Sequence, residues 1–86
     1  MYNLRKIFIE LLKEYSENEK IIYIKNDNIS YGEISEMNYN DEMNPYIIIK
    51  VNGEKIRTYI DNVFLKKNPY LNLTIRQFKL LLKKFN

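Results

Sequence analysis

The dipeptide Asn52-Gly53 restricts the fold of this chain more than any other feature of the sequence. It separates two β-rich runs, YIIIKV and EKIRTY. Asn-Gly in this position predicts a type I′ hairpin turn, because both central residues of that turn have a positive φ. A two-residue turn also fixes which residues lie opposite each other. We therefore predict a hairpin over residues 46–59 in which Val51 faces Glu54 and Tyr46 faces Tyr59.

The alternation of side chains gives this hairpin two different faces. The face that holds Ile49 and Ile56 is predicted to be core, where each buried aliphatic side chain contributes about 1.5–3 kcal/mol. The other face is predicted to point outward, and it mixes basic, aromatic and aliphatic side chains: Tyr46, Ile48, Lys50, Lys55, Arg57 and Tyr59.

The residues before this hairpin predict a helix, a second hairpin and a loop. NLRKIFIELLKEY is an amphipathic helix with Asn3 as its N-cap. The run over residues 20–37 is a hairpin that turns at Asn26-Asp27-Asn28, and the apolar phase of its second strand switches at Gly32. Such a switch at glycine predicts a bulge or a sharp bend there. Residues 38–45 are predicted to be a polar loop.

The last segment predicts a second amphipathic helix. Thr74 and Gln77 match a capping box, so the helix is expected to begin there. Residues 61–70 are expected to form a turn or a single helical turn that inserts Val63 or Phe64 into the core. Helical spacing predicts a buried stripe and, on the adjacent face, a basic group: Ile75, Phe78, Leu81, Leu82 and Phe85 in the stripe, and Arg76, Lys79 and Lys83 beside it.

These elements predict one α+β domain over residues 1–86, in which helices flank a four-stranded bent antiparallel sheet in the order α-β-β-β-β-α. The segments IIYIKNDNISYGEISEM and YIIIKVNGEKIRTYIDNVF, within residues 20–65, resemble a small SH3-like barrel. The resemblance implies a strongly bent sheet that binds peptides, modified tails or nucleic acid rather than catalysing a reaction. The aromatic cage and proline groove of better-known members have no counterpart, since the chain lacks Trp and an aromatic cluster in one loop.

Composition narrows the chemistry. The chain has no Cys and no His, which removes thiolate ligands, the cysteine nucleophile and the commonest general base. Its two glycines cannot form a Gly-rich phosphate loop. We therefore predict a protein that is not an enzyme and has no cofactor, metal or small-molecule substrate. No apolar run approaches the roughly 18 residues of a membrane span and no secretion signal is evident, so we expect a cytoplasmic protein without a membrane partner.

The residue usage also indicates an origin. Six residue types with AT-rich codons (Ile, Asn, Lys, Tyr, Phe and Met) supply 51 of the 86 residues, and Ala is absent. Genome base composition is the simplest explanation. We expect an AT-rich bacterium, its phage or another mobile element, with an AT-rich eukaryote left open.

Charge is distributed unevenly along the chain. Residues 1–45 carry 5 Lys and Arg against 9 Asp and Glu, whereas residues 46–86 carry 9 against 2. The outer face of the hairpin and the basic face of the last helix are therefore the candidate partner-binding residues. In the first half, Glu33, Glu36, Asp41 and Glu42 are expected in or near the loop. Their carboxylates could attract a cation or a basic partner, but we expect them to be solvated.

Three interpretations of the basic and tyrosine face remain open. It could be solvated, it could bind an acidic protein surface, or it could bind single-stranded nucleic acid through cations and stacking rings. The preferred functional prediction is a non-enzymatic protein-interaction module of AT-rich bacterial or phage origin. A phage-encoded inhibitor of a host defence or nucleic-acid enzyme is one such module. A nucleic-acid-binding domain that uses the same face is the alternative.

Overall fold

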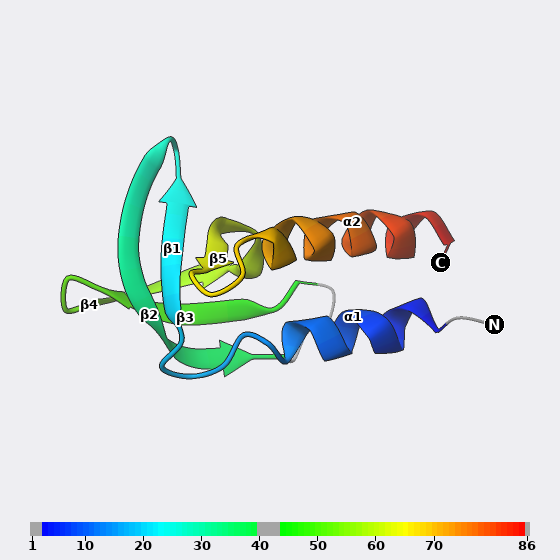
Figure 1. The fold of residues 1–86 in the computed structure, drawn as a ribbon, viewed down its shortest axis with the longest axis horizontal. Helices are drawn as coiled ribbons and strands as arrows, with labels where there is room; N and C mark the ends of the chain where they lie inside the picture. The colour runs from blue at the N-terminus through cyan, green and yellow to red at the C-terminus, as the bar shows by residue number, and fades with distance from the viewer. Residues whose placement is uncertain (1–2, 40–43, 86) are drawn as a thin grey trace.

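Two helices lie side by side at one end of a five-stranded antiparallel sheet (Figure 1). A computed structural model describes residues 3–39 and 44–85. The strands follow the order β4-β3-β2-β1-β5 across the sheet. In chain order the elements are α1 (Leu4–Leu12), β1 (Lys20–Lys25), β2 (Asn28–Asn38), β3 (Tyr46–Val51), β4 (Glu54–Tyr59), the 3₁₀ helix η1 (Ile60–Asn62), β5 (Val63–Leu65) and α2 (Tyr70–Phe85).

The α+β class and the two flanking helices are confirmed, but the predicted number of strands is wrong. The fifth strand, β5, pairs antiparallel with β1, and Val63 lies opposite Tyr23. The 3₁₀ helix η1 turns the chain so that β5 can reach β1. Val63 and Leu65 are buried, whereas Phe64 between them is only partly buried. The sheet does not close into a barrel, because β4 and β5 remain its two edges.

The register of the β3–β4 hairpin is confirmed. Asn52 has φ 52° and Gly53 has φ 81°, as a type I′ turn requires. The pairs run from Val51 opposite Glu54 to Tyr46 opposite Tyr59. The inner face is buried at Ile47, Ile49, Val51 and Thr58, and Ile56 packs against the same core.

Strand β2 bends between its two neighbours (Figure 1). It pairs with β1 as far as Glu33 and with β3 from Glu33 onward. The prediction at Gly32 was a bulge or a sharp bend, and the bulge is wrong, because Gly32 pairs in register with Ile21 and the register shift lies between Ile34 and Glu36. Gly32 instead permits close approach, since a Cβ atom there would overlap the backbone carbonyl of Lys50. Strand β3 can therefore fold tightly against the bend in β2.

The N-terminal helix begins as predicted. Asn3 caps α1, and its Oδ1 accepts a hydrogen bond of 3.1 Å from the backbone N–H of Lys6. Phe8 and Leu12 are buried on the helix, and Tyr15 is buried just after it.

The C-terminal helix begins earlier than predicted. It starts at Tyr70, directly after Pro69, whose missing N–H suits the start of a helix. The hydroxyl of Thr74 donates to the backbone carbonyl of Tyr70 inside the helix, so the capping box is wrong. No helix in residues 3–39 or 44–85 is long and apolar enough to cross a bilayer.

The stripe of α2 is narrower than predicted. Ile75 and Leu82 are buried and Phe78 packs against the core, but Leu81 is 39% exposed. The C-terminal half of α2 extends beyond the sheet and runs beside α1 (Figure 1). Because α1 packs against this half and the sheet does not, a narrower strip of the helix surface is buried than in the N-terminal half. The predicted burial of Phe85 concerns a side chain outside the described part of the structure.

Candidate functional site

The outer face of β3 and β4 brings together the six side chains that the register assigned to it. Its centre is a stacked pair, in which the guanidinium carbon of Arg57 lies 3.9 Å from the centroid of the Tyr46 ring. Asn38 Nδ2 donates a hydrogen bond of 2.8 Å to the Tyr46 hydroxyl. A cation over an aromatic face is attracted by the ring quadrupole. Tyr46 is thus held by β2, and Arg57 is positioned by Tyr46.

A hollow of about 300 Å³ adjoins this pair, lined by Lys25, Tyr46, Arg57, Thr58, Tyr59 and Asn62. Tyr59 is 58% exposed and offers a ring surface at the hollow. Lys25 and Asn62 come from β1 and η1, and the sequence reasoning missed both. They reach β4 only because β5 pairs with β1 and so brings η1 beside the end of β1.

Three lysines at this surface form no ion pair with the residues that the structure describes. Lys50 and Lys55 lie opposite each other in the ladder and are exposed, and Lys25 is exposed beside the hollow. Like charges opposite each other in a sheet repel, so an external anion would relieve this arrangement.

Carboxylates interrupt the positive charge on the neighbouring strand. Glu33 and Glu36 belong to β2 rather than to the loop, and they lie opposite Lys50 and Ile48. Glu33 forms an ion pair of 3.0 Å with Lys20 of β1. The outer face therefore has mixed charge across the sheet. Asp41 and Glu42 lie outside the described residues.

A second, more open hollow lies beside Glu33. It has a volume of about 450 Å³ and is lined by Lys20, Tyr31, Gly32, Glu33, Lys50, Asn52 and Gly53.

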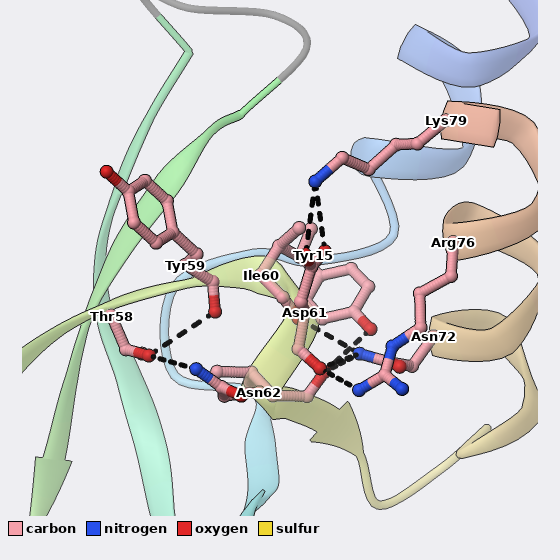
Figure 2. A network of polar contacts seen from close by, with 10 residues as sticks. Tyr15, Thr58, Tyr59, Ile60, Asp61, Asn62, Asn72, Arg76 and Lys79 are labelled. Carbon is pink, nitrogen blue, oxygen red and sulfur yellow. Dashed lines mark hydrogen bonds and ion pairs between the residues drawn. The ribbon is translucent and has the colours of Figure 1, made fainter. Parts of the chain in front are cut away.

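The predicted basic face of α2 is largely an internal contact (Figure 2). Lys79 Nζ lies 3.1 and 3.2 Å from the two carboxylate oxygens of Asp61, and its side chain is only 10% exposed. Arg76 donates to the backbone carbonyl of Asp61 and lies over the Phe64 ring, 5.4 Å from its centroid. Lys83, in the last turn, is exposed.

The expectation that Lys79 lies on an exposed binding face is therefore not met. Its charge is compensated within the chain by Asp61, which η1 places against α2. A cation that is mostly removed from water needs such a partner.

A buried polar network joins Tyr15, which follows α1, to η1, β5 and α2 (Figure 2). Asn72 is 1% exposed, and its Nδ2 donates to the carbonyls of Ile60 at 2.9 Å and Val63 at 2.7 Å. The Tyr15 hydroxyl donates to the same Val63 carbonyl at 2.9 Å. These bonds satisfy the Val63 carbonyl and give the Ile60 carbonyl, which accepts from the Val63 N–H, a second donor. The network holds the helices on the sheet.

Because of this network, the free energy of unfolding falls as the pH rises in the alkaline range. Burial raises the pKa of Tyr15 from 10.0 to about 12. The folded state therefore holds the phenol proton more tightly than the unfolded state. The associated stabilisation, about 2–3 kcal/mol, is complete below pH 10 and is lost as the pH rises from about 10 to 12.

This loss is measurable by urea unfolding between about pH 9 and 12. Burial also raises the pKa of Tyr39, so Tyr15→Phe should flatten the alkaline decline without abolishing it. An equally steep decline in Tyr15→Phe would contradict the assignment to Tyr15.

Of the nine predicted site residues, six share the outer face of β3 and β4, Arg76 and Lys79 fasten α2, and Lys83 is exposed on α2. Within the described residues, no group of three or more carboxylates could hold a metal ion. No protein-family model, no curated protein and no solved structure matches this chain.

Proposed function

We propose that this chain is a small, non-enzymatic protein-interaction module that binds an acidic surface of another protein. The binding surface is the outer face of β3 and β4 together with Lys25. The observation that carries the proposal is the Arg57–Tyr46 stack beside the exposed ring of Tyr59. Arg and Tyr are enriched among the residues that dominate binding energy at interfaces.

The charge of the partner follows from Lys25, Lys50 and Lys55, which form no ion pair with the described residues. Lys25, Lys50 and Lys55 would each gain a counter-ion from an acidic surface, which steers encounter and selects the partner. Tyr59 and the half-buried Ile48 would supply apolar contact area between these charges.

Two observations favour a protein over single-stranded nucleic acid. Glu33 and Glu36 lie on the strand next to β3 and would repel a phosphate backbone that followed the sheet. One face of the Tyr46 ring is covered by Arg57, which leaves Tyr59 as the exposed ring of the predicted pair. A stacking platform for successive bases needs more than one open ring.

The proposal extends to the role of the interaction. A small chain without Cys or His acts most simply by covering a surface of its partner. We assign it to the phage-encoded inhibitors of an AT-rich bacterium, with a host defence or nucleic-acid enzyme as target. The bent β2 strand and the meander from β1 to β4 support a comparison with the SH3-like barrels, which bind rather than catalyse.

A gel-shift titration separates the protein partner from nucleic acid. We expect no shift of arbitrary single-stranded oligonucleotides at about 150 mM salt. If five cations, such as Lys25, Lys50, Lys55, Arg57 and Lys83, neutralised phosphates, log K would instead fall with log salt at a slope of about −3 to −4. A clear shift at about 150 mM salt, together with that slope, would favour the nucleic-acid alternative over this proposal.

A further inference from the structure

Strand β4 presents an open backbone edge. In an antiparallel ladder, residues of alternate pairs direct their N–H and C=O groups away from the partner strand. The two-residue turn makes Val51 and Glu54 the first hydrogen-bonded pair, so Lys55, Arg57 and Tyr59 point these groups outward. Lys55 and Arg57 form no hydrogen bond on that side with any described residue, whereas the Tyr59 carbonyl accepts from the Thr58 hydroxyl at 3.4 Å.

The opposite edge, β5, is closed by the chain itself. The Val63 N–H donates to the Ile60 carbonyl, and the Val63 carbonyl accepts from Tyr15 and Asn72. The Leu65 carbonyl accepts from the N–H of Asn68. A strand that adds to the full length of one edge therefore has β4 available and β5 blocked.

The side chains along β4 select the kind of strand that can add there. Antiparallel pairing of two copies about Arg57 would set one arginine against the other, and like charges opposite each other destabilise a sheet. An acidic strand would instead place carboxylates beside Lys55 and Arg57. Charge complementarity therefore favours a different, acidic chain over a second copy.

Resting on the function proposed above, we propose that the acidic partner binds as an extended strand added to the edge of β4. Its acidic residues are two positions apart and lie beside Lys55 and Arg57 on the outer face. The residue between them is apolar, because its side chain falls on the inner face next to the half-buried Ile56. Main-chain hydrogen bonds supply affinity and the alternate side chains supply specificity.

A second stretch of open backbone competes with β4. Residues 29 and 31 of β2 extend beyond β3, since β2–β3 pairing begins at Glu33. Their side chains, Ile29 and Tyr31, are 62% and 67% exposed and uncharged. An acidic segment would meet no cation at these two positions, so it is expected to prefer β4.

Amide hydrogen exchange, followed by NMR on the full chain, tests this geometry. The probe is a short synthetic peptide of alternating Glu and Val, and its control alternates Lys and Val. In the free protein the amide hydrogens of Ile56 and Thr58 should exchange slowly and those of Lys55 and Arg57 quickly. Saturating Glu–Val peptide should slow Lys55 and Arg57 at least tenfold, and the Lys–Val peptide should have no effect. Protection at residues 29 and 31 instead, or no binding of the Glu–Val peptide, would overturn the strand geometry.

A matched pair of variants at residue 55 separates the backbone from the side chain. Because the Lys55 N–H points outward, Lys55→Pro removes no hydrogen bond of the sheet. Urea unfolding of both variants verifies that each remains folded. Lys55→Ala should weaken binding of the Glu–Val peptide less than about fivefold, as expected for a rim charge. Lys55→Pro should weaken it at least tenfold.

Equal effects of the two variants would overturn strand addition. This failure is distinct from failure of the proposed function, which would be shown by a partner protein that binds the Arg57→Glu variant as tightly as the unmodified chain.

Discussion

Gly32→Ala is expected to destabilise the protein by about 3 kcal/mol or more, because the added methyl group overlaps main-chain atoms that cannot rotate away. The new Cβ would meet the Lys50 carbonyl and would lie 2.9 Å from Val51 Cγ2. Relief would require β3 to move away from the bend in β2, which would open the core between them. Urea unfolding followed by circular dichroism measures the loss.

Gly53→Ala is the matched control for this substitution. Gly53 has φ 81°, but nothing lies within 4 Å of a Cβ added there. Its cost is therefore conformational, about 1–2 kcal/mol for a non-glycine residue in the left-handed region. If Gly53→Ala destabilised the protein more than Gly32→Ala, the close approach of β3 would not be the role of Gly32.

Asn72→Ala is expected to destabilise the protein by about 1–3 kcal/mol, since it removes two buried hydrogen bonds that each contribute about 0.5–1.5 kcal/mol. The Ile60 and Val63 carbonyls would each lose the Asn72 amide, although the Val63 N–H and the Tyr15 hydroxyl would still donate to them. The same denaturant titration measures this change. Gln77→Ala, an exposed position on the same helix, should change stability by no more than about 0.5 kcal/mol. Equal effects of the two variants would show that the Asn72 amide does not hold η1 and β5 in place.

The hairpin register could be predicted because one local signal determines it. Asn52-Gly53 fixes the turn type, the turn fixes the pairing, and alternation then assigns every side chain to a face. The strand β5 could not be predicted in this way. It has three residues, too few for alternation to be recognised, and it exists because η1 returns the chain to β1.

The misplacement of Lys79 has a different cause. Helical spacing correctly groups Arg76, Lys79 and Lys83, but it cannot tell which face meets a carboxylate that lies 18 residues earlier in the chain. The early start of α2 at Tyr70 follows from Pro69, whereas Thr74 and Gln77 match the capping pattern inside a helix that is already formed.

The surface proposed to bind a partner could be predicted along the hairpin but not across the sheet. Lys25 and Asn62 join it through the β1–β5 pairing, and Glu33 and Glu36 join it through a β2–β3 register that contains a shift. Compared with the surface predicted from the sequence, the observed surface has an additional lysine beside the hollow and two carboxylates on its flank. Both differences favour a partner with discrete acidic groups over a continuous phosphate backbone.

Binding of an acidic protein to the outer face of β3 and β4, as proposed above, can be tested with a partner that is captured from bacterial lysate, identified and purified. The affinity of this partner is measured for the unmodified chain and for Arg57→Glu. We predict that Arg57→Glu loses at least about 30-fold in affinity, as a binding hot spot of 2 kcal/mol or more implies. Lys6→Glu, the same charge change on exposed α1, should bind as the unmodified chain does. Equal affinities for all three proteins would contradict the proposal.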